Sequence, residues 1–413
     1  MRQAKLINLL KVAALALGLG AAVGLVLWLF LRVVALGSTL IWQTLPGAVH
    51  GKWITVPLCA LAGLAAGLLR RRYGDYPESL ETVMGKMKRD KYYDYANMLP
   101  MLGCAVLPLI AGASVGPEAG LTGIISALCY WVGDNVTFAR QNAGLYSQLG
   151  EAVTLGQLFH MPLFGILAVE EQEGDEDAPQ ALPRAQKLVL YGLAAAGGFL
   201  AMALLNRLFH TSVEGFPKFA EATIQAGDYL MVLLYIPIGF LLCLLFEGAE
   251  RLAKRCAGFV PDVAREVICG AGVALVGLAV PMALFSGEEQ MATLMESPAA
   301  FGAWALIGLC LLKLVLTAFC LSFGMKGGHF FPLIFACVCM GYGLTGLFFG
   351  GAMEHAAFAG AVLTASALGA QMKKPLAVSA LLLLCFPPRL LLWIFVAAAL
   401  ASQMTGLLRR EGE

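Results

Sequence analysis

The chain has few charged residues. Only 13% of its 413 residues are Asp, Glu, Lys or Arg, whereas a soluble protein of ordinary composition has about 25%. Hydrophobic residues make up 59% of the chain, and the mean hydropathy is +0.78. This composition excludes a soluble globular protein and predicts an integral membrane protein. The net charge of +1 provides no basic surface of the kind that binds nucleic acid.

Residue patterns typical of an enzyme or a metal centre are also missing. The sequence has no H-E-x-x-H motif, and no Ser, His and Asp set lies in its apolar segments. Its 11 cysteines form no C-x-x-C pair and have no His at ligand spacing. Ten of them lie in apolar segments, where cysteine acts as a small buried side chain. We therefore expect no catalytic residues, no metal site and no cofactor.

Long apolar stretches predict an all-α polytopic membrane protein. Several of them approach the roughly 20 residues needed to cross a bilayer. The long stretches are 6–36, 54–69, 188–205, 229–246, 267–285, 301–321 and 390–401. The first is too long for a signal peptide and has no cleavage motif, so we expect a retained helix. Shorter apolar segments, bounded by Gly or Pro, predict half-spanning helices buried within the protein.

The positions of Lys and Arg predict the topology. Basic residues precede the first stretch, follow the second at 70–72 and 86–91, and lie at 409–410, whereas 37–51 has none. The positive-inside rule then places both termini in the cytoplasm, and we expect the cell (inner) membrane. The polar run 70–94 is expected to be a cytoplasmic loop. Only four residues follow Arg409, so we expect no cytoplasmic regulatory domain.

Two glycine–proline loops lie half a chain apart, and each opens an apolar helix. The first contains Gly116 and Pro117, and the second runs from residue 324 to Pro332. A second proline follows each loop, at 45 residues in the first half (162 − 117) and 43 in the second (375 − 332). Such interrupted segments at matching places in two halves indicate the binding site of a transporter. We predict one transmembrane domain, 1–413, with inverted halves 5–210 and 227–405.

Inverted halves would bring the two loops to a shared site near the middle of the membrane. The free N–H groups and positive dipole ends of helix N-termini would then face one another, which makes an anion site without a basic side chain. The residues alone therefore predict a protein that handles anions.

The order of these loops resembles the CLC family of chloride channels and proton-coupled chloride transporters, over nearly the whole chain. The family's G-S-G-I-P signature falls on 73–77, which keeps essentially only the proline. Its second signature, G-R/K-E-G-P, falls on 113–117. Its third, G-x-F-x-P, is matched fully by 328–332, and 159–167 followed by Glu170 and Glu171 also matches a family stretch. The resemblance implies a homodimer in membrane lipid, with one pore in each subunit.

The resemblance also implies which residues bind the anion. Backbone N–H groups near Val115, Gly116, Phe330 and Phe331 would coordinate it. The family's serine ligand falls on Gly74, and its tyrosine ligand falls near 385–389, where there is no tyrosine. Both hydroxyl ligands are therefore missing. The candidate anion-binding residues are Gly74, Val115, Gly116, Pro117, Gly328, His329, Phe330, Phe331 and Arg389.

Two of these side chains have alternative interpretations. His329 either donates to the anion or senses pH, or else caps backbone carbonyls. Arg389 follows two prolines at the expected start of the last helix, where it either draws anions to the pore or lies at the membrane interface.

The gate is the largest departure from the family. The family's gating glutamate falls on Val115, which can neither compete with an anion nor take up a proton. Glu118 lies three residues later, which we interpret as one helical turn along the same face. It either replaces the gate or complements the helix dipole. Glu171 aligns with the family's internal proton glutamate, and it is otherwise a solvated carboxylate in an acidic run.

Three functions follow as hypotheses, and a fourth is set aside. The first is transport of chloride or a similar small inorganic anion, channel-like or weakly coupled to protons. The second is proton/anion antiport with Glu118 as displaced gate and Glu171 as inner proton acceptor. The third is a cation transporter using Asp75, Glu118 and Glu171, which the helix N-termini disfavour. An intramembrane enzyme is set aside for lack of its motifs. The preferred anion stays open among chloride, nitrate, fluoride, bicarbonate and larger anions.

Overall fold

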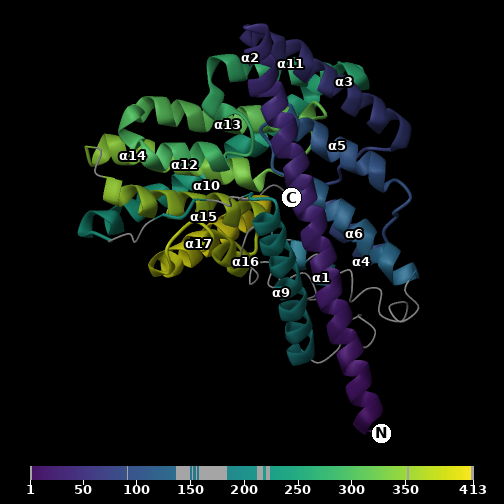
Figure 1. Ribbon diagram of the computed structural model, residues 1–413. Helices are drawn as coiled ribbons and strands as arrows, with labels where there is room; N and C mark the ends of the chain where they lie inside the picture. Colours follow the sequence, from purple (N-terminus) through teal and green to yellow (C-terminus); the bar gives the residue numbers. More distant parts are fainter. Residues whose placement is uncertain are drawn as a thin grey trace. The chain divides into compact units, whose positions relative to one another are not determined.

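The computed structural model describes residues 2–90, 92–135, 149–150, 152–154, 156–157, 184–211, 217–219, 224–350 and 353–410. Within these ranges the regular structure is helical and contains no strand, so the predicted all-α class is confirmed (Figure 1). The α-helices are α1 (Arg2–Thr39), α2 (Leu45–Val49), α3 (Thr55–Tyr73), α4 (Leu80–Asp90), α5 (Met98–Ile110), α6 (Glu118–Asn135), α9 (Arg184–Leu208), α10 (Ala226–Ala257), α11 (Asp262–Ala279), α12 (Glu288–Glu296), α13 (Ala303–Ser322), α14 (Phe330–Phe348), α15 (Ala356–Met372), α16 (Pro375–Leu382) and α17 (Leu391–Arg410).

Seven helical segments in the described residues are long and apolar enough to cross a membrane. Six of them coincide with predicted stretches, and the seventh is α14. The predicted stretch 267–285 differs, because α11 begins earlier, at Asp262, and ends at Ala279. Its N-terminal part carries Asp262, Arg265 and Glu266, which keeps this helix out of the seven.

Chain contacts divide the protein into two compact units. The first comprises Met1–Ala35, Pro77–Leu102 and Glu118–Gly215, and the second comprises Leu36–Tyr76, Gly103–Pro117 and Phe216–Glu413. These units do not follow the halves predicted from the repeat, because each unit takes segments from several places in the chain. The division into inverted halves stays a prediction.

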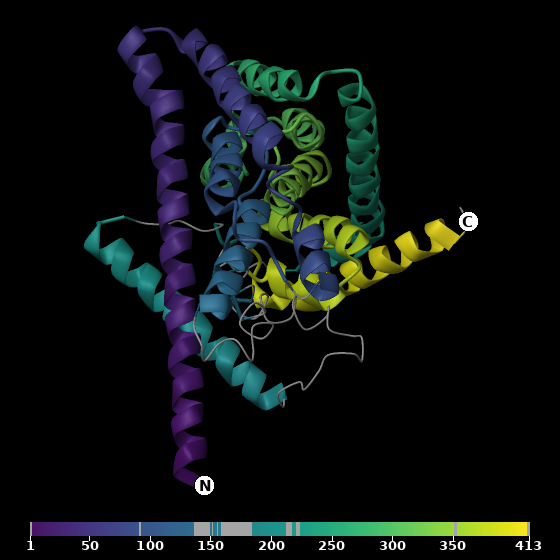
Figure 2. The ribbon, with the colours of Figure 1, turned by 90° about the vertical axis from the view of Figure 1, so that its right-hand side faces the viewer.

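In the first unit, α1 packs closely against α9 through glycines. A methyl group at Gly20 would lie 1.8 Å from the carbonyl oxygen of Ala194, and one at Gly24 would lie 2.5 Å from that of Gly198. Small residues let two helix backbones approach in this way. The Trp28 indole also donates to Asn206 across this contact, at 2.9 Å. The N-terminal helix α1 therefore packs on α9, and the two helices cross in Figure 2.

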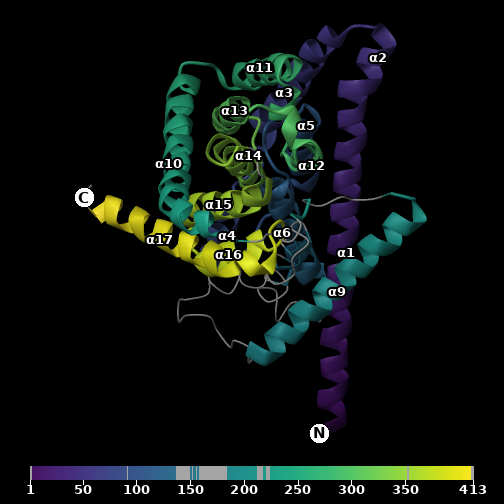
Figure 3. The same cartoon turned by 90° about the vertical axis from the view of Figure 1, so that its left-hand side faces the viewer.

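In the second unit, α14 and α15 form the buried centre. Nearly every residue of both helices is buried, and α10 lies beside α15 while α13 packs on α14 (Figure 3). A helix that is apolar on all sides belongs in such a core. α15, with 17 residues, and α16, with eight, are mostly buried. The eight-residue α16 is too short to span a membrane alone, as expected of a half-spanning helix.

The polar run 70–94 is not a single loop, which corrects the prediction. α3 continues to Tyr73, and α4 begins at Leu80. Ser79 starts this helix, since its hydroxyl accepts from the N–H of Thr82 at 3.2 Å and its carbonyl accepts from Val83 at 3.0 Å. A serine placed in this way is a standard N-cap, and it was the signal that the sequence analysis missed.

Candidate anion site

The loop 112–117 is buried and held by several backbone hydrogen bonds. Gly112 has a left-handed φ of +79°, and a methyl group there would lie 2.7 Å from the ring of Trp42. Its carbonyl oxygen accepts from the N–H of Phe285 at 3.1 Å. The N–H of Val115 donates to the carbonyl of Ala113 at 2.8 Å. This loop is therefore a tight turn that only glycine allows at position 112.

Gly116 joins the loop 112–117 to the loop 324–329. Its N–H donates to the carbonyl of Gly328 at 2.8 Å, and the N–H of Gly328 donates back to the carbonyl of Gly116 at 2.7 Å. Each glycine lies two residues before a helix, α6 or α14. The two Gly–Pro loops therefore meet, as the sequence predicted, although they are 212 residues apart (328 − 116).

Two of the amides predicted to be anion ligands are used by backbone hydrogen bonds, one within the loop 112–117 and one between the two loops. The N–H groups of Val115 and Gly116 bond to carbonyls of the protein. Phe330 and Phe331 form the first turn of α14 and are buried, with His329 as its N-cap residue. The start of a helix presents N–H groups along its axis, so α14 supplies the positive dipole end at this site.

Val115 itself is completely buried and packs against the opposite loop. A methyl group at Gly327 would lie 2.6 Å from Cγ2 of Val115, so the two loops touch here through a glycine. The residue at this position is a valine and not an acidic residue, and its side chain makes an apolar contact with Gly327.

The helical turn assumed between Val115 and Glu118 is not present, and this corrects the argument for a displaced gate. α6 begins at Glu118, and Val115 lies in the loop before it. Glu118 is nevertheless 1% exposed, and its carbonyl accepts from the hydroxyl of Thr122 at 2.7 Å. Glu171 lies outside the described residues.

His329 lies between two aromatic rings at the start of α14. Its ring centroid lies 4.6 Å from that of Phe330 and 5.8 Å from that of Phe246. Nε2 is buried and has no hydrogen-bond partner among the described residues. A buried unpaired nitrogen of this kind is costly, which is consistent with a ligand contact.

Gly74 ends α3 in an exposed turn with φ of +122°. The residue that reaches the loop 324–329 is its neighbour, Asp75, which forms ion pairs with Lys326 and Arg70. Arg70 also donates to the carbonyl of Gly324 at 2.9 Å. The turn 73–77 therefore contacts the loop 324–329 through the charged side chain of Asp75. The sequence pattern did not assign this residue to anion binding.

A buried lysine supports the same region. Lys313 of α13 is completely buried, and its Nζ donates to the carbonyls of Ala283 and Leu284 at 3.0 and 2.9 Å, and to that of Phe285 at 2.5 Å. Phe285 in turn donates to Gly112. The lysine thus holds the segment that supports the first Gly–Pro loop. Pattern reasoning missed this role because the accepting carbonyls lie about thirty residues away in the chain.

Arg389 is exposed in the 3-10 turn Pro388–Leu390 that precedes α17. The predicted helix start is therefore confirmed, whereas its part in anion binding stays a prediction.

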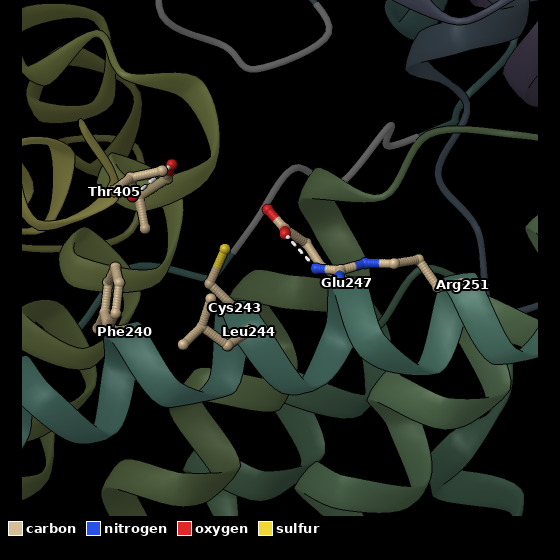
Figure 4. Close-up of a pocket in the computed structure, with 7 residues that line it drawn as sticks. Phe240, Cys243, Leu244, Glu247, Arg251 and Thr405 are labelled. Carbon is tan, nitrogen blue, oxygen red and sulfur yellow. Dashed lines mark hydrogen bonds and ion pairs between the residues drawn. The ribbon is translucent and has the colours of Figure 1, made fainter. Parts of the chain in front are cut away.

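A cavity of about 170 Å³ in the second unit lies apart from these loops in the chain. It is lined by Phe240, Cys243, Leu244, Glu247, Arg251, Ala370 and Thr405. Arg251 bonds to Glu247 at 3.1 Å across one helical turn of α10 (Figure 4). None of its lining residues belongs to the turn 73–77 or to either Gly–Pro loop. We therefore place the candidate site at the loops and not in this cavity.

Comparisons with known proteins show the family and the fold of this chain. The family model described as voltage gated chloride channel matches residues 62–406, which is most of the chain. A YfeO ion-transport protein of Escherichia fergusonii is 26% identical over 358 residues, which is 82% of this chain and 79% of that protein. The YfeO protein of Shigella flexneri is 25% identical over the same shares.

Three solved structures share the fold. A slow cyanobacterial Cl⁻/H⁺ antiporter aligns with a TM-score of 0.76 and 17% identity, over 97% of this chain and 98% of that one. A CLC-type fluoride/proton antiporter aligns with a TM-score of 0.72 and 18% identity, over 96% and 95%. A eukaryotic CLC transporter aligns with a TM-score of 0.73 and 16% identity, over 98% of this chain and 72% of its own. Identities this low establish the fold alone.

Proposed function

This chain belongs to the voltage gated chloride channel family, and on that premise we propose that it carries chloride or a similar small inorganic anion through the path bounded by its Gly–Pro loops. CLC-type anion transport by an integral membrane protein is the activity of the family. We further propose a channel-like or weakly proton-coupled mode, in a homodimer of the inner membrane with both termini in the cytoplasm.

The reciprocal bridge between Gly116 and Gly328 carries this proposal. It joins the two loops directly before helix starts, which is where a helix dipole favours an anion. At α14 the dipole end adjoins Phe330, Phe331 and the unpaired Nε2 of His329, so an anion would meet N–H donors and apolar surface there. Gly74, Pro117 and Arg389 complete the proposed set.

Val115 supports the channel-like mode. A buried valine has no proton to exchange and no charge to occlude the path. Transport in which each anion is exchanged against protons would therefore need a different carboxylate.

Glu118 keeps the antiporter as a second candidate. A carboxylate that is 1% exposed in a membrane protein is costly, and such groups commonly carry protons. The solved relatives described as antiporters, of chloride in one case and fluoride in another, favour the same possibility. In this candidate Glu118 is the outer proton acceptor and Glu171 the inner one.

The proposed transport is tested in liposomes that contain the purified protein and potassium chloride. Chloride efflux after addition of valinomycin is expected for the wild type, whereas sodium or potassium flux without valinomycin is not. Val115→Glu is expected to lower the efflux at pH 7, because a carboxylate would compete with the anion. Cation flux without chloride flux would overturn the proposal.

The transport mode is tested by the reversal potential under a pH gradient with chloride equal on both sides. The channel-like mode predicts no shift of this potential. A shift that disappears in Glu118→Gln would establish the antiporter instead. Repeating the efflux measurement with fluoride and nitrate, and comparing the rates with that of chloride, identifies the preferred anion.

A further inference from the structure

Four charged side chains meet where the turn 73–77 contacts the loop 324–329. They are Arg70 at the end of α3, Asp75 in the turn, Glu266 in the first part of α11 and Lys326 in the loop. Lys326 lies two residues before Gly328, which pairs with Gly116. The two basic and two acidic groups balance in charge, and they lie beside the proposed anion path.

The buried part of this cluster is rigid. Nη1 of Arg70 donates to Oε1 of Glu266 at 2.6 Å and to the carbonyl of Gly324 at 2.9 Å. The side chains of Arg70 and Glu266 are only 14% and 5% exposed. Separating such a buried pair would leave an uncompensated charge, which is costly. The bonds to Glu266 and Gly324 therefore keep Arg70 in place when Asp75 releases it.

The outer part of the cluster is held much less tightly. The Asp75 carboxylate bonds to Arg70 through Oδ1 and to Lys326 through Oδ2, and it is 69% exposed. Among the described residues, Asp75 is the only carboxylate paired with Lys326. The Lys326 side chain is 30% exposed, so solvent reaches this pair mainly from the Asp75 side, where water and salt screen it. A small anion that reaches this point can therefore replace Asp75 as the partner of Lys326.

We propose that Asp75 and Lys326 form an ion-pair latch on the anion path: Lys326 binds the incoming anion when Asp75 releases it. The latch rests on the proposed anion transport and adds a side-chain ligand to it. The amides of Gly116 and Gly328 are used by the bridge between the loops, so a cation two residues away supplies attraction that these amides do not. The ligand is an inorganic anion, which Lys326 recognises by charge.

The competing explanation is a structural brace, in which the ion pair between Asp75 and Lys326 only stabilises the fold. The two single variants distinguish this brace from the latch. Asp75→Asn frees Lys326 without changing the size of the side chain. Lys326→Met keeps the length of the side chain but removes the anion contact, while Asp75 stays paired with Arg70. The latch therefore predicts opposite effects from the two variants, whereas a brace predicts that both lower transport.

The experiment measures chloride efflux from liposomes as a function of chloride concentration. We expect Asp75→Asn to raise efflux several-fold and Lys326→Met to lower it several-fold, with a higher half-saturating chloride concentration. The double variant should behave like Lys326→Met, and Lys326→Arg should retain most of the wild-type efflux. Arg71→Met, which removes an exposed cation one residue from Arg70, is the matched control and should leave efflux unchanged.

Calorimetric titration of the detergent-purified protein with chloride gives a second measurement that does not need transport. Tighter binding by Asp75→Asn and weaker binding by Lys326→Met are expected. Lower efflux in both single variants at an unchanged half-saturating concentration would overturn the latch and leave anion transport standing, as would unchanged efflux in both. A wild type that neither transports nor binds chloride would overturn the proposed function and the latch together.

Discussion

Ser114 and Thr317 share a buried hydrogen bond, with their hydroxyl oxygens 2.8 Å apart. Thr317 uses its own proton to donate to the carbonyl of Lys313 at 2.8 Å, so Ser114 is the donor between the two hydroxyls. This bond ties the first Gly–Pro loop to α13 over a sequence separation of 203 residues.

The direction of this bond predicts unequal effects of the two substitutions. Thr317→Val leaves the Ser114 hydroxyl buried without an acceptor and should cost about 1–3 kcal/mol of stability. Ser114→Ala removes one bond but leaves Thr317 satisfied, so it should cost about 0.5–1.5 kcal/mol. The midpoint of thermal unfolding in detergent measures both. Thr293→Val, at an exposed threonine with the same bond to its own helix, is the control. A larger loss in Ser114→Ala than in Thr317→Val would contradict the assignment of the donor.

Lys313 should be a stabilising residue although its amine is buried. Its Nζ satisfies three carbonyls and lies 5.6 Å from the centre of the Phe335 ring. Lys313→Met keeps the side-chain length but leaves those carbonyls without this donor, so we expect a loss of about 1–3 kcal/mol. The unfolding midpoint is again the measurement, with the exposed Lys52→Met as control. An unchanged midpoint for Lys313→Met would show that these hydrogen bonds make no net contribution to the free energy of unfolding.

Gly327 should tolerate no side chain because Val115 occupies the space. Gly327→Ala would place a methyl group 2.6 Å from Cγ2 of Val115 and 2.8 Å from the carbonyl oxygen of Gly116. We expect chloride efflux to fall at least several-fold, because the bridge between the loops must shift. Gly308→Ala in α13, where nothing lies within 4 Å, should have no such effect.

Removing the Val115 side chain should partly restore transport in the Gly327→Ala variant. Val115→Gly removes the side-chain atoms that Gly327→Ala meets, so the double variant should recover part of the lost efflux. Failure of this rescue, with both proteins folded, would indicate that Gly327 acts through its backbone and not through the contact with Val115.

The ion pairs of Asp75 predict a particular dependence of stability on pH. Burial raises the pKa of the Asp75 carboxyl, but hydrogen bonds from Lys326 and Arg70 outweigh it and leave the pKa below its usual value of 3.8. A carboxyl with a depressed pKa in the folded state stabilises the protein above its unfolded-state pKa, and this contribution is lost as the pH falls through the folded-state pKa. The difference in unfolding midpoint between wild type and Asp75→Asn should therefore be constant from pH 7 to about 5 and shrink below about 4. A difference that grows on acidification would contradict the ion pairs.

The N-terminal helix should depend on particular glycines for its packing. Gly20→Ala would bring a methyl group to 1.8 Å from the carbonyl oxygen of Ala194 in α9, whereas Gly18 has nothing within 4 Å. We expect Gly20→Ala to lower the unfolding midpoint and Gly18→Ala to leave it equal or slightly higher, since alanine favours a helix by about 0.5–1 kcal/mol over glycine. Equal effects of the two variants would exclude close packing of α1 on α9.

Most of the fold could be predicted from local patterns. Long apolar runs require a bilayer, so the positions of α1, α3, α9, α10, α13 and α17 followed from the sequence. Pro375 and the glycines before α6 and α14 marked helix starts correctly. One error arose where a short polar signal acts, because the N-cap Ser79 begins α4 within a polar run.

The site could be predicted only in part, for a physical reason. A glycine–proline loop shows in the sequence that a helix begins nearby, whereas the assignment of the family's gating position to Val115 stays a prediction from the resemblance. By contrast, no local pattern indicates that Asp75 meets Lys326, because those residues are 251 positions apart. Glu118 was placed correctly at a helix start, but the turn that should have aligned it with Val115 was wrong.

The sequence by itself therefore determined a membrane-embedded all-helical chain of this family, with two Gly–Pro loops that open helices. These features depend on hydrophobicity and on backbone preference, and both are set by residues that are close together in the sequence. Tertiary structure alone decided that Gly116 and Gly328 exchange backbone bonds, that Lys313 caps distant carbonyls and that Lys326 is held by Asp75. Hydrogen bonds require the donor and the acceptor to lie about 3 Å apart, so only the folded chain brings these partners within reach.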